Sequence, residues 1–169
     1  MGAECFGADE ETLESVVGVL CARRRLTLTC AESCTGGLLA ATITHKAGAS
    51  KFFERGFVTY SNESKEEMLG VPKPLLDMTG AVSAPVAEAM ARGALRNSQA
   101  HLSISITGVA GPDGGTAKKP VGTVYFGYAL KGGSAGSIHY EFKGSRTEIQ
   151  TQAALTALKD LIEILEREP

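Results

Sequence analysis

The chain has 169 residues, the usual length of one globular domain, and its 43% hydrophobic and 21% charged residues are typical of a protein that buries one core. Its 17 Lys and Arg residues against 19 Asp and Glu residues give a net charge of −2, without the basic excess that phosphate-backbone binding usually leaves in a sequence. Aromatic residues make up only 6% and Trp is absent, which argues against a platform for stacking bases or sugars. We therefore expect no nucleic-acid partner.

Neither a membrane segment nor an export signal is visible. No apolar run approaches the roughly 20 residues that a bilayer-spanning helix needs, and the acidic N-terminus lacks the basic and apolar regions of a signal peptide. The four cysteines, Cys5, Cys21, Cys30 and Cys34, do not have the spacing of zinc ligands, and no His follows them closely. These features predict a cytoplasmic protein with reduced thiols, no membrane partner and no metal site.

Hydrophobic periodicity predicts helices that alternate with strands through the first part of the chain. The expected elements are a helix over 10–24 with Asp9 as its N-cap, a strand over 26–30, a helix over 38–46, a strand over 55–60, a helix from Ser61-Asn62 to Leu69, and a helix from Ser83 to about Gln99. Gly70 and Pro72 stop the fifth of these elements, and Pro85 lies in the first turn of the sixth.

The second part begins with a strictly alternating strand over 102–107, which is followed by a Gly- and Pro-rich loop over 108–120. Strands over 121–130 and 137–143 form an expected antiparallel hairpin, and Ser145 to Glu148 is a capping box that opens the last helix. This order predicts an α/β fold, a three-layer α/β/α sandwich with a mixed, mostly parallel sheet of about five strands. We expect one domain over residues 1–169, with residues 1–9 as a flexible N-terminus.

Ligands of open α/β sheets bind outside the carboxyl ends of the strands, and Ser33 lies at such a place. It follows a predicted strand and precedes a predicted helix, so its hydroxyl can be presented where backbone N–H groups of the first helical turn also point. Such N–H groups bind an anion or a developing oxyanion. The alternative interpretation is a plain N-cap serine, with Gly36 and Gly37 serving close packing.

Two further segments occupy similar positions. Tyr60 ends a predicted strand and Lys65 lies about one turn into the next helix, although most lysines are simply solvated. The loop that follows Thr107 holds four glycines, a proline and Asp113, and its amides can approach a phosphate or a carbonyl group closely. It is neither a Walker loop nor a dinucleotide fingerprint. Cys34 is a second candidate nucleophile, and Arg146 can reach an anion.

Together these segments resemble the CinA C-terminal-domain family, whose characterised members are nicotinamide-nucleotide amidases. The resemblance spans roughly Leu13 to Leu165, and its motifs are Ala31-Glu32-Ser33-Cys34-Thr35-Gly36-Gly37, residues 53–62 with Lys65, Gly80-Ala81-Val82-Ser83, residues 105–115, and Lys119-Pro120-Val121-Gly122-Thr123-Val124. The N-terminal molybdopterin-binding-like domain of two-domain members is not found, so the chain is similar to a stand-alone amidase.

The resemblance implies hydrolysis of the carboxamide of nicotinamide mononucleotide to nicotinate mononucleotide and ammonia, without a metal or cofactor. It also implies that Ser33 is the nucleophile and Lys65 the general base, assisted by Tyr60 and Thr107. An amide hydrolase without His or metal still needs an activated hydroxyl, and a Lys of lowered pKa is the remaining strong base. The candidate substrate-binding residues are Thr35, Gly36, Gly37, Gly108, Gly111, Asp113, Gly114 and Arg146.

Recognition of the substrate phosphate stays open among Thr35, the 108–115 loop and Arg146. A homo-oligomer is expected from the resemblance alone. Two other functions are alternatives: a nucleotide-sensing module without turnover, in which Ser33 is only a cap, and a thiol amidase that uses Cys34. Release of ammonia by the wild type, Ser33→Ala and Cys34→Ala distinguishes the three.

Overall fold

The computed structural model describes residues 12–167 and contains one five-stranded sheet. Its strands are β1 (Leu28–Glu32), β2 (Phe53–Val58), β3 (Leu102–Gly108), β4 (Thr123–Leu130) and β5 (Ala135–Glu141), in the spatial order β2-β1-β3-β4-β5. Strand β1 pairs in parallel with β2 and β3, and β4 runs antiparallel to β3 and β5, so four of the five strands point the same way. The predicted mixed, mostly parallel sheet is confirmed.

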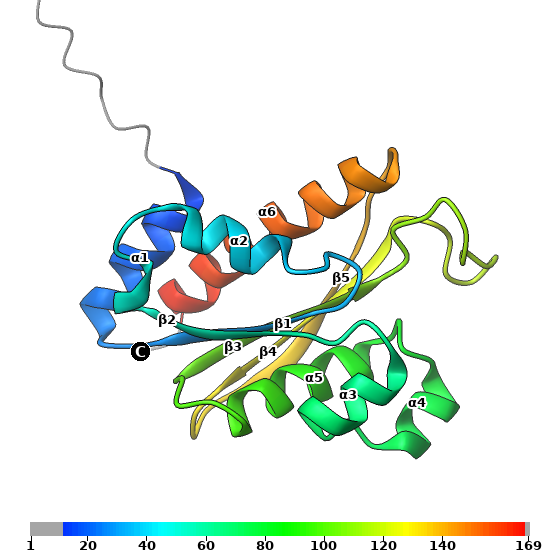
Figure 1. Ribbon diagram of the computed structural model, residues 1–169, viewed down its shortest axis with the longest axis horizontal. Helices are drawn as coiled ribbons and strands as arrows, with labels where there is room; N and C mark the ends of the chain where they lie inside the picture. The colour runs from blue at the N-terminus through cyan, green and yellow to red at the C-terminus, as the bar shows by residue number, and fades with distance from the viewer. Residues whose placement is uncertain (1–11, 168–169) are drawn as a thin grey trace, which may run out of the picture.

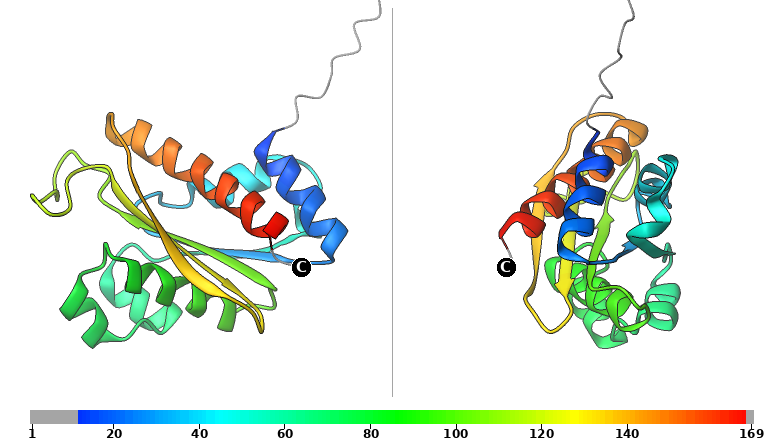
Figure 2. Two further views of the ribbon diagram at one scale, coloured as in Figure 1. Left: turned by 180° about the vertical axis from the view of Figure 1, so that it is seen from behind. Right: turned by 90° about the vertical axis from the view of Figure 1, so that its left-hand side faces the viewer.

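Helices cover both faces of this sheet (Figure 1). One face carries α1 (Leu13–Arg24), α2 (Leu38–His45) and α6 (Arg146–Arg167), and the other carries α3 (Asn62–Leu69), α4 (Lys73–Thr79) and α5 (Ala84–Arg96). The two further views in Figure 2 show the same three layers. A separate apolar core lies on each side, the larger one under α1, α2 and α6 and the smaller one under α3, α4 and α5. The predicted three-layer sandwich is confirmed.

Several element boundaries differ from the sequence prediction. Strand β1 ends at Glu32 rather than at residue 30, and β2 ends at Val58 rather than at residue 60. Helix α4 and the 3₁₀ turn η1 (Ala49–Lys51) were not predicted; Pro72 is the N-cap of α4, a helix start that tolerates proline, rather than only the end of α3. Helix α1 begins at Leu13 with Thr12 as its N-cap, so the expected start at residue 10 with Asp9 as the cap is wrong. The expected flexibility of residues 1–9 lies outside the described residues.

A row of hydroxyl groups holds α5 close to the central strand β3. Ser103, Ser105 and Thr107 lie on the same face of β3, and their hydroxyls donate to backbone carbonyls of α5 and of the loop before it, at 2.7, 2.6 and 2.9 Å. The neighbouring strand β4 has Gly127 where it meets α5. A Cβ atom at Gly127 would lie 2.0 Å from the carbonyl oxygen of Ala87. The hydrogen bonds from the β3 hydroxyls and the absence of a side chain at Gly127 therefore let α5 pack closely on the sheet.

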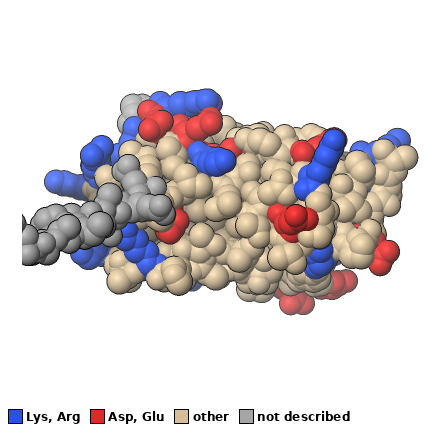
Figure 3. Space-filling view, turned by 90° about the horizontal axis from the view of Figure 1, so that it is seen from above, with Lys and Arg blue, Asp and Glu red and all other residues tan. Residues whose placement is uncertain are grey.

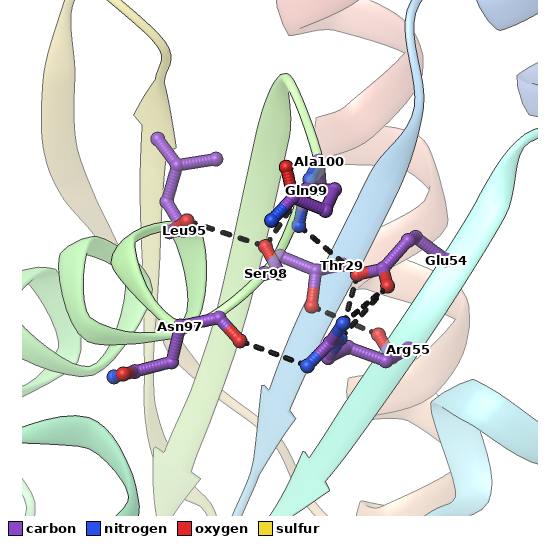
Figure 4. Close-up of polar contacts among 8 residues, drawn as sticks. All are labelled: Thr29, Glu54, Arg55, Leu95, Asn97, Ser98, Gln99 and Ala100. Atoms are coloured by element: carbon purple, nitrogen blue, oxygen red, sulfur yellow. Dashed lines mark hydrogen bonds and ion pairs between the residues drawn. The ribbon is translucent and has the colours of Figure 1, made fainter.

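A polar cluster at the amino ends of the strands ties the edge strand β2 to the α5–β3 connection (Figure 4). Arg55 pairs with the carboxylate of Glu54 and donates to the carbonyl of Asn97 at 3.1 Å. The Glu54 carboxylate also accepts the backbone N–H of Gln99 at 3.4 Å, and the Thr29 hydroxyl donates to the Arg55 carbonyl at 2.8 Å. These contacts lie at the opposite end of the strands from Ser33, so we assign them to stabilising the fold rather than to the candidate site.

A buried polar pair joins α6 to β5. Asp160 is only 2% exposed; its Oδ1 accepts the Tyr140 hydroxyl at 2.8 Å, while its Oδ2 has no hydrogen-bond partner within residues 12–167. Burial raises the pKa of Asp160 to about 6 and, together with the hydrogen bond to Asp160, the pKa of Tyr140 to about 12. Asp160 is thus a buried carboxyl group that retains its proton to unusually high pH.

The first prediction concerns Gly93, where α5 crosses the end of α3. A Cβ atom on Gly93 would lie 2.0 Å from the backbone oxygen of Leu69, which cannot move alone. We expect Gly93→Ala to lower the free energy of unfolding by about 2 kcal/mol or more in urea denaturation, although Ala normally stabilises a helix interior. The control is Gly18→Ala in α1, where the nearest atom belongs to the Phe52 ring, which can rotate. Equal stability of the two variants would contradict this packing argument.

The second prediction concerns pH. An unfolded Asp ionises near 3.9, whereas folded Asp160 ionises at about 6, so the folded state binds more protons between these values. The contribution of Asp160 to stability is therefore present at low pH and falls by about 2 kcal/mol between pH 4 and pH 7. Asp160→Asn lacks this titration, so its stability relative to the wild type should rise by that amount over the same range. Urea denaturation at both pH values measures it, and a constant difference would disprove it.

Candidate active site

Ser33 is the first residue after β1, and hydrogen bonds on both sides of it continue the pairing of the sheet. Its backbone N–H donates to the carbonyl of Ile106 in β3 at 2.9 Å, and the Glu32 carbonyl accepts the N–H of Thr59 at 2.8 Å. Side chains alternate along a strand, so Ser33 faces the α3 side together with Ala31, which belongs to the core under α3 to α5. The interior position of β1 therefore sets the face of the sheet on which the Ser33 hydroxyl lies.

Lys65 lies on α3, one turn after the N-cap Ser61, whose hydroxyl accepts the N–H of Ser64 at 3.0 Å. The side chain is 1% exposed, and its Nζ donates to Ser33 Oγ at 3.0 Å and to the Thr59 carbonyl at 2.9 Å. Two more carbonyls of the strand-to-helix connection lie 3.4 Å from Nζ. Lys65 is therefore not the solvated surface lysine of the alternative interpretation.

Burial lowers the pKa of Lys65, because a charged ammonium loses its hydration in the interior. The neighbouring Cys34 and Glu63 groups partly offset this effect on the pKa of Lys65. The site thus contains an amine that releases its proton more readily than an ordinary lysine and lies within hydrogen-bond distance of a serine hydroxyl.

A cavity of about 310 Å³ opens at the carboxyl ends of β1, β2 and β3, the right-hand end of the sheet in Figure 1. The predicted site residues that line it are Ser33, Tyr60, Lys65, Thr107, Gly108, Gly111, Asp113, Gly114 and Arg146, along with the rival nucleophile Cys34. Three predicted segments that are distant in the chain thus meet at one cavity.

The sequence analysis did not single out five further lining residues, Asn62, Ala81, Val82, Val109 and Ala110. Asn62 is the first residue of α3, and the others belong to loops that touch the cavity through small or apolar groups. The Ala and Val side chains carry no chemical signal, whereas the side-chain amide of Asn62 can donate and accept hydrogen bonds. Their position inside the motifs around Lys65, Val82 and Gly108 was the indication that they share.

Thr35, Gly36 and Gly37 were candidates for substrate binding, but the structure does not place them in the cavity lining. The Thr35 hydroxyl donates to the buried carboxylate of Glu32 at 2.6 Å, and the Gly37 N–H donates to the same carboxylate at 3.2 Å. Gly36 and Gly37 have φ values of 59° and 102°, which glycine adopts readily, so their role is to form the turn.

The amides of the first turn of α2 are also occupied. Leu39 and Ala40 donate their N–H groups to the Glu32 carboxylate at 3.0 and 2.8 Å. The sequence analysis expected these amides to point at the same place as the Ser33 hydroxyl, but they point at an internal carboxylate on the opposite face of the sheet. The N-cap of α2 is Gly37 rather than Ser33, so the plain N-cap interpretation of Ser33 is wrong.

Tyr60 and Arg146 contact each other at the mouth of the cavity. The guanidinium of Arg146 donates to the Tyr60 hydroxyl at 2.8 Å and to the Gly111 carbonyl at 2.7 Å. Tyr60 is 62% exposed, whereas the Thr107 hydroxyl is buried and donates to the carbonyl of Ala81 at 2.9 Å. Arg146 thus links the end of β2, the glycine-rich loop and the start of α6.

Cys34 lines the cavity but is only 6% exposed, and burial raises the pKa of its thiol to about 12. A thiol of this kind holds almost no reactive thiolate near neutral pH. Within residues 12–167, no three His, Cys, Asp or Glu side chains lie close enough together to hold a metal ion.

On the surface over α1, α2 and α6, basic and acidic side chains are interspersed, and neither sign forms a continuous patch (Figure 3). No helix in the described part of the chain has both the length and the apolar character needed to cross a bilayer.

Comparison with known proteins identifies the family. The model of the CinA C-terminal domain matches residues 10–165, and the chain belongs to this family, as the sequence motifs indicated. The nicotinamide-nucleotide amidohydrolase PncC of Enterobacter agglomerans is 51% identical over 139 residues, which cover 80% of this chain and 85% of that protein.

A CinA-like protein of Geobacter sulfurreducens is 51% identical over 158 residues, which cover 94% of this chain, and this chain spans 38% of that relative's length. The fold also matches a crystal structure of a CinA superfamily protein from Klebsiella pneumoniae. That protein is 35% identical and superposes with a TM-score of 0.88 over 92% of this chain and 97% of that one.

Proposed function

We propose that this protein is an amidase that hydrolyses the carboxamide of nicotinamide mononucleotide to nicotinate mononucleotide and ammonia. The observation that carries the proposal is the buried contact of 3.0 Å between Lys65 Nζ and Ser33 Oγ beside the cavity. The Enterobacter relative, whose name is that of a nicotinamide-nucleotide amidohydrolase, supports this substrate class. The cavity of about 310 Å³ is within the usual size of small-molecule sites.

The reaction begins with neutral Lys65. Its two hydrogens donate to surrounding carbonyls such as that of Thr59, which aims the nitrogen lone pair at the Ser33 hydroxyl. As Lys65 takes the hydroxyl proton, Ser33 Oγ attacks the carboxamide carbon, and the proton then passes from Lys65 to the amide nitrogen. The C–N bond breaks, ammonia leaves, and the acyl group remains as an ester on Ser33.

Water completes the cycle. Lys65 takes a proton from the water that attacks the ester carbon, and it returns this proton to Ser33 Oγ as the ester bond breaks. The product carboxylic acid passes its remaining proton to solvent and leaves as a carboxylate. The backbone N–H groups of Gly108, Ala110 and Gly111, residues that line the cavity, are the donors that we propose for the oxyanion of both steps, because the Val109 N–H already donates to the Thr123 carbonyl at 2.9 Å.

The charged residues of the cavity support a proposal for how the rest of the substrate binds. Besides Lys65, which acts as the base, Asp113 and Arg146 are the charged residues among the described residues that line the cavity. Lys65 is committed to Ser33, so Arg146 is the group that binds the phosphate, and Asp113 faces the cationic pyridinium ring. Tyr60 orients Arg146 through their 2.8 Å hydrogen bond, and Thr107 anchors the end of β3 to Ala81.

The two alternatives fit the geometry less well. A binding module without turnover has no need of a lysine buried against a serine hydroxyl, because burial of an ammonium costs free energy that nucleotide binding does not recover. A thiol amidase requires an accessible thiolate at Cys34, whereas the pKa of this buried thiol is raised to about 12.

The third prediction identifies the nucleophile. Ser33→Ala should lower kcat for ammonia release from nicotinamide mononucleotide by several orders of magnitude, because the covalent route is lost. Cys34→Ala, the matched control at the neighbouring position, should stay within about tenfold of the wild type. A coupled ammonia assay measures both variants. The opposite ranking would assign the reaction to the thiol.

The fourth prediction concerns the base. Because Lys65 acts when deprotonated and burial lowers its pKa, kcat/KM should rise with pH through an apparent pKa below the ordinary value for lysine. Lys65→Arg should be nearly as inactive as Lys65→Ala, since Arg keeps its proton. Turnover is measured beside the circular dichroism spectrum. A folded Lys65→Arg variant with more than about a tenth of the wild-type kcat would show that Lys65 only supplies positive charge.

A further inference from the structure

Glu32 is a buried carboxylate at the carboxyl end of strand β1. The proposed reaction does not use it directly. It is the last residue of β1, the strand between β2 and β3, and it is 0% exposed. Burial of a carboxylate costs free energy unless its oxygens are well paired. The Glu32 oxygens accept from five described groups: the Thr35 hydroxyl at 2.6 Å, the N–H groups of Gly37, Leu39 and Ala40 at 3.2, 3.0 and 2.8 Å, and the Cys30 thiol at 3.8 Å.

The three N–H contacts take the place of an ordinary helix cap. The N-cap residue of α2 is Gly37, which has no side chain to accept the amides of the first turn. Glu32 accepts them from the preceding strand, and its charge also suits the positive end of the helix. Because Glu32 does this, the Ser33 hydroxyl is not needed as a cap and is available to Lys65.

The neighbouring residues Glu32 and Ser33 point to opposite faces of the sheet. Glu32 faces α2 and Ser33 faces α3, since successive side chains of a strand point in opposite directions. One peptide plane joins them, so a rotation of the Glu32 side of this plane also turns the Ser33 Oγ away from Lys65.

We propose that Glu32 is a positioning residue for the nucleophile: its carboxylate fixes the turn over residues 33–37 and thereby holds Ser33 Oγ in reach of Lys65 Nζ. This inference rests on the proposed function of Ser33. Glu32 touches neither the substrate nor the reacting atoms, and it does not line the cavity. Its loss should therefore reduce the reactivity of Ser33 and leave the binding of the substrate intact.

The test uses Glu32→Gln, which keeps the shape but replaces one accepting oxygen with an NH₂ group that faces backbone donors. We expect kcat to fall at least tenfold while KM for nicotinamide mononucleotide changes less than threefold. Labelling of Ser33 by a serine-directed fluorophosphonate, followed by mass spectrometry, should slow in parallel. Thr35→Val removes only one of the five contacts and should lower kcat about threefold, again without a change in KM.

Asp160→Asn is the matched control, because it also removes a buried carboxyl group but lies on α6, away from the turn over residues 33–37. Its kcat and Ser33 labelling should stay within twofold of the wild type. If Glu32→Gln lowers the melting temperature but keeps kcat and labelling within twofold, Glu32 is only a cap of α2 and the proposal is wrong.

If Glu32→Gln does not fold, Thr35→Val decides: an unchanged kcat and labelling rate in this variant would overturn the proposal. The failure of the proposed function gives a different pattern. A wild type that labels at Ser33 without hydrolysing the nucleotide refutes the substrate, and the labelling rates of the variants still test Glu32. A wild type with neither turnover nor labelling refutes both proposals.

Discussion

The site depends on the burial of one ammonium group. Lys65 is nearly inaccessible, and hydration that it loses is replaced by backbone carbonyls such as that of Thr59 and by the Ser33 hydroxyl. These acceptors surround the Lys65 amine only if α3 begins directly beside the end of β1. The Ser61 cap sets the start of α3 and the left-handed Gly70 cap sets its end, against which α5 packs closely at Gly93. The same burial lowers the pKa of Lys65, so one packing arrangement supplies both position and basicity.

The charged groups around the end of β1 have separate roles: Glu32 stabilises the fold, whereas Arg146 is proposed to bind the substrate. The anion site at the N-terminus of α2, which in many α/β proteins binds a phosphate, is occupied by Glu32 of the same chain. A phosphate on the substrate therefore requires another cation, and Arg146 lies at the cavity mouth. Its bonds to Tyr60 and Gly111 join segments from three parts of the chain, so the group that we propose for phosphate binding also holds the mouth together.

Much of this arrangement could be predicted from local patterns. The alternating run before Thr107 and the capping box at Ser145 predicted β3 and α6, because periodicity and cap chemistry act over a few residues. The carboxyl-end rule for parallel strands also brought Ser33, Lys65 and the glycine-rich loop together correctly. Helix α4 was missed because its prolines look like chain breakers until the start of the helix is known.

The sequence by itself therefore determined the order of the elements, the three-layer architecture and the segments that form the cavity, since these follow from hydrophobic periodicity and turn chemistry. Only the tertiary structure decided the tasks of individual polar residues. Glu32 lies between Ala31 and Ser33 in the chain, yet its partners are on α2 and those of Ser33 are on α3. Likewise, the burial that lowers the pKa of Lys65 and raises that of Cys34 arises from packing between distant elements, which no local pattern encodes.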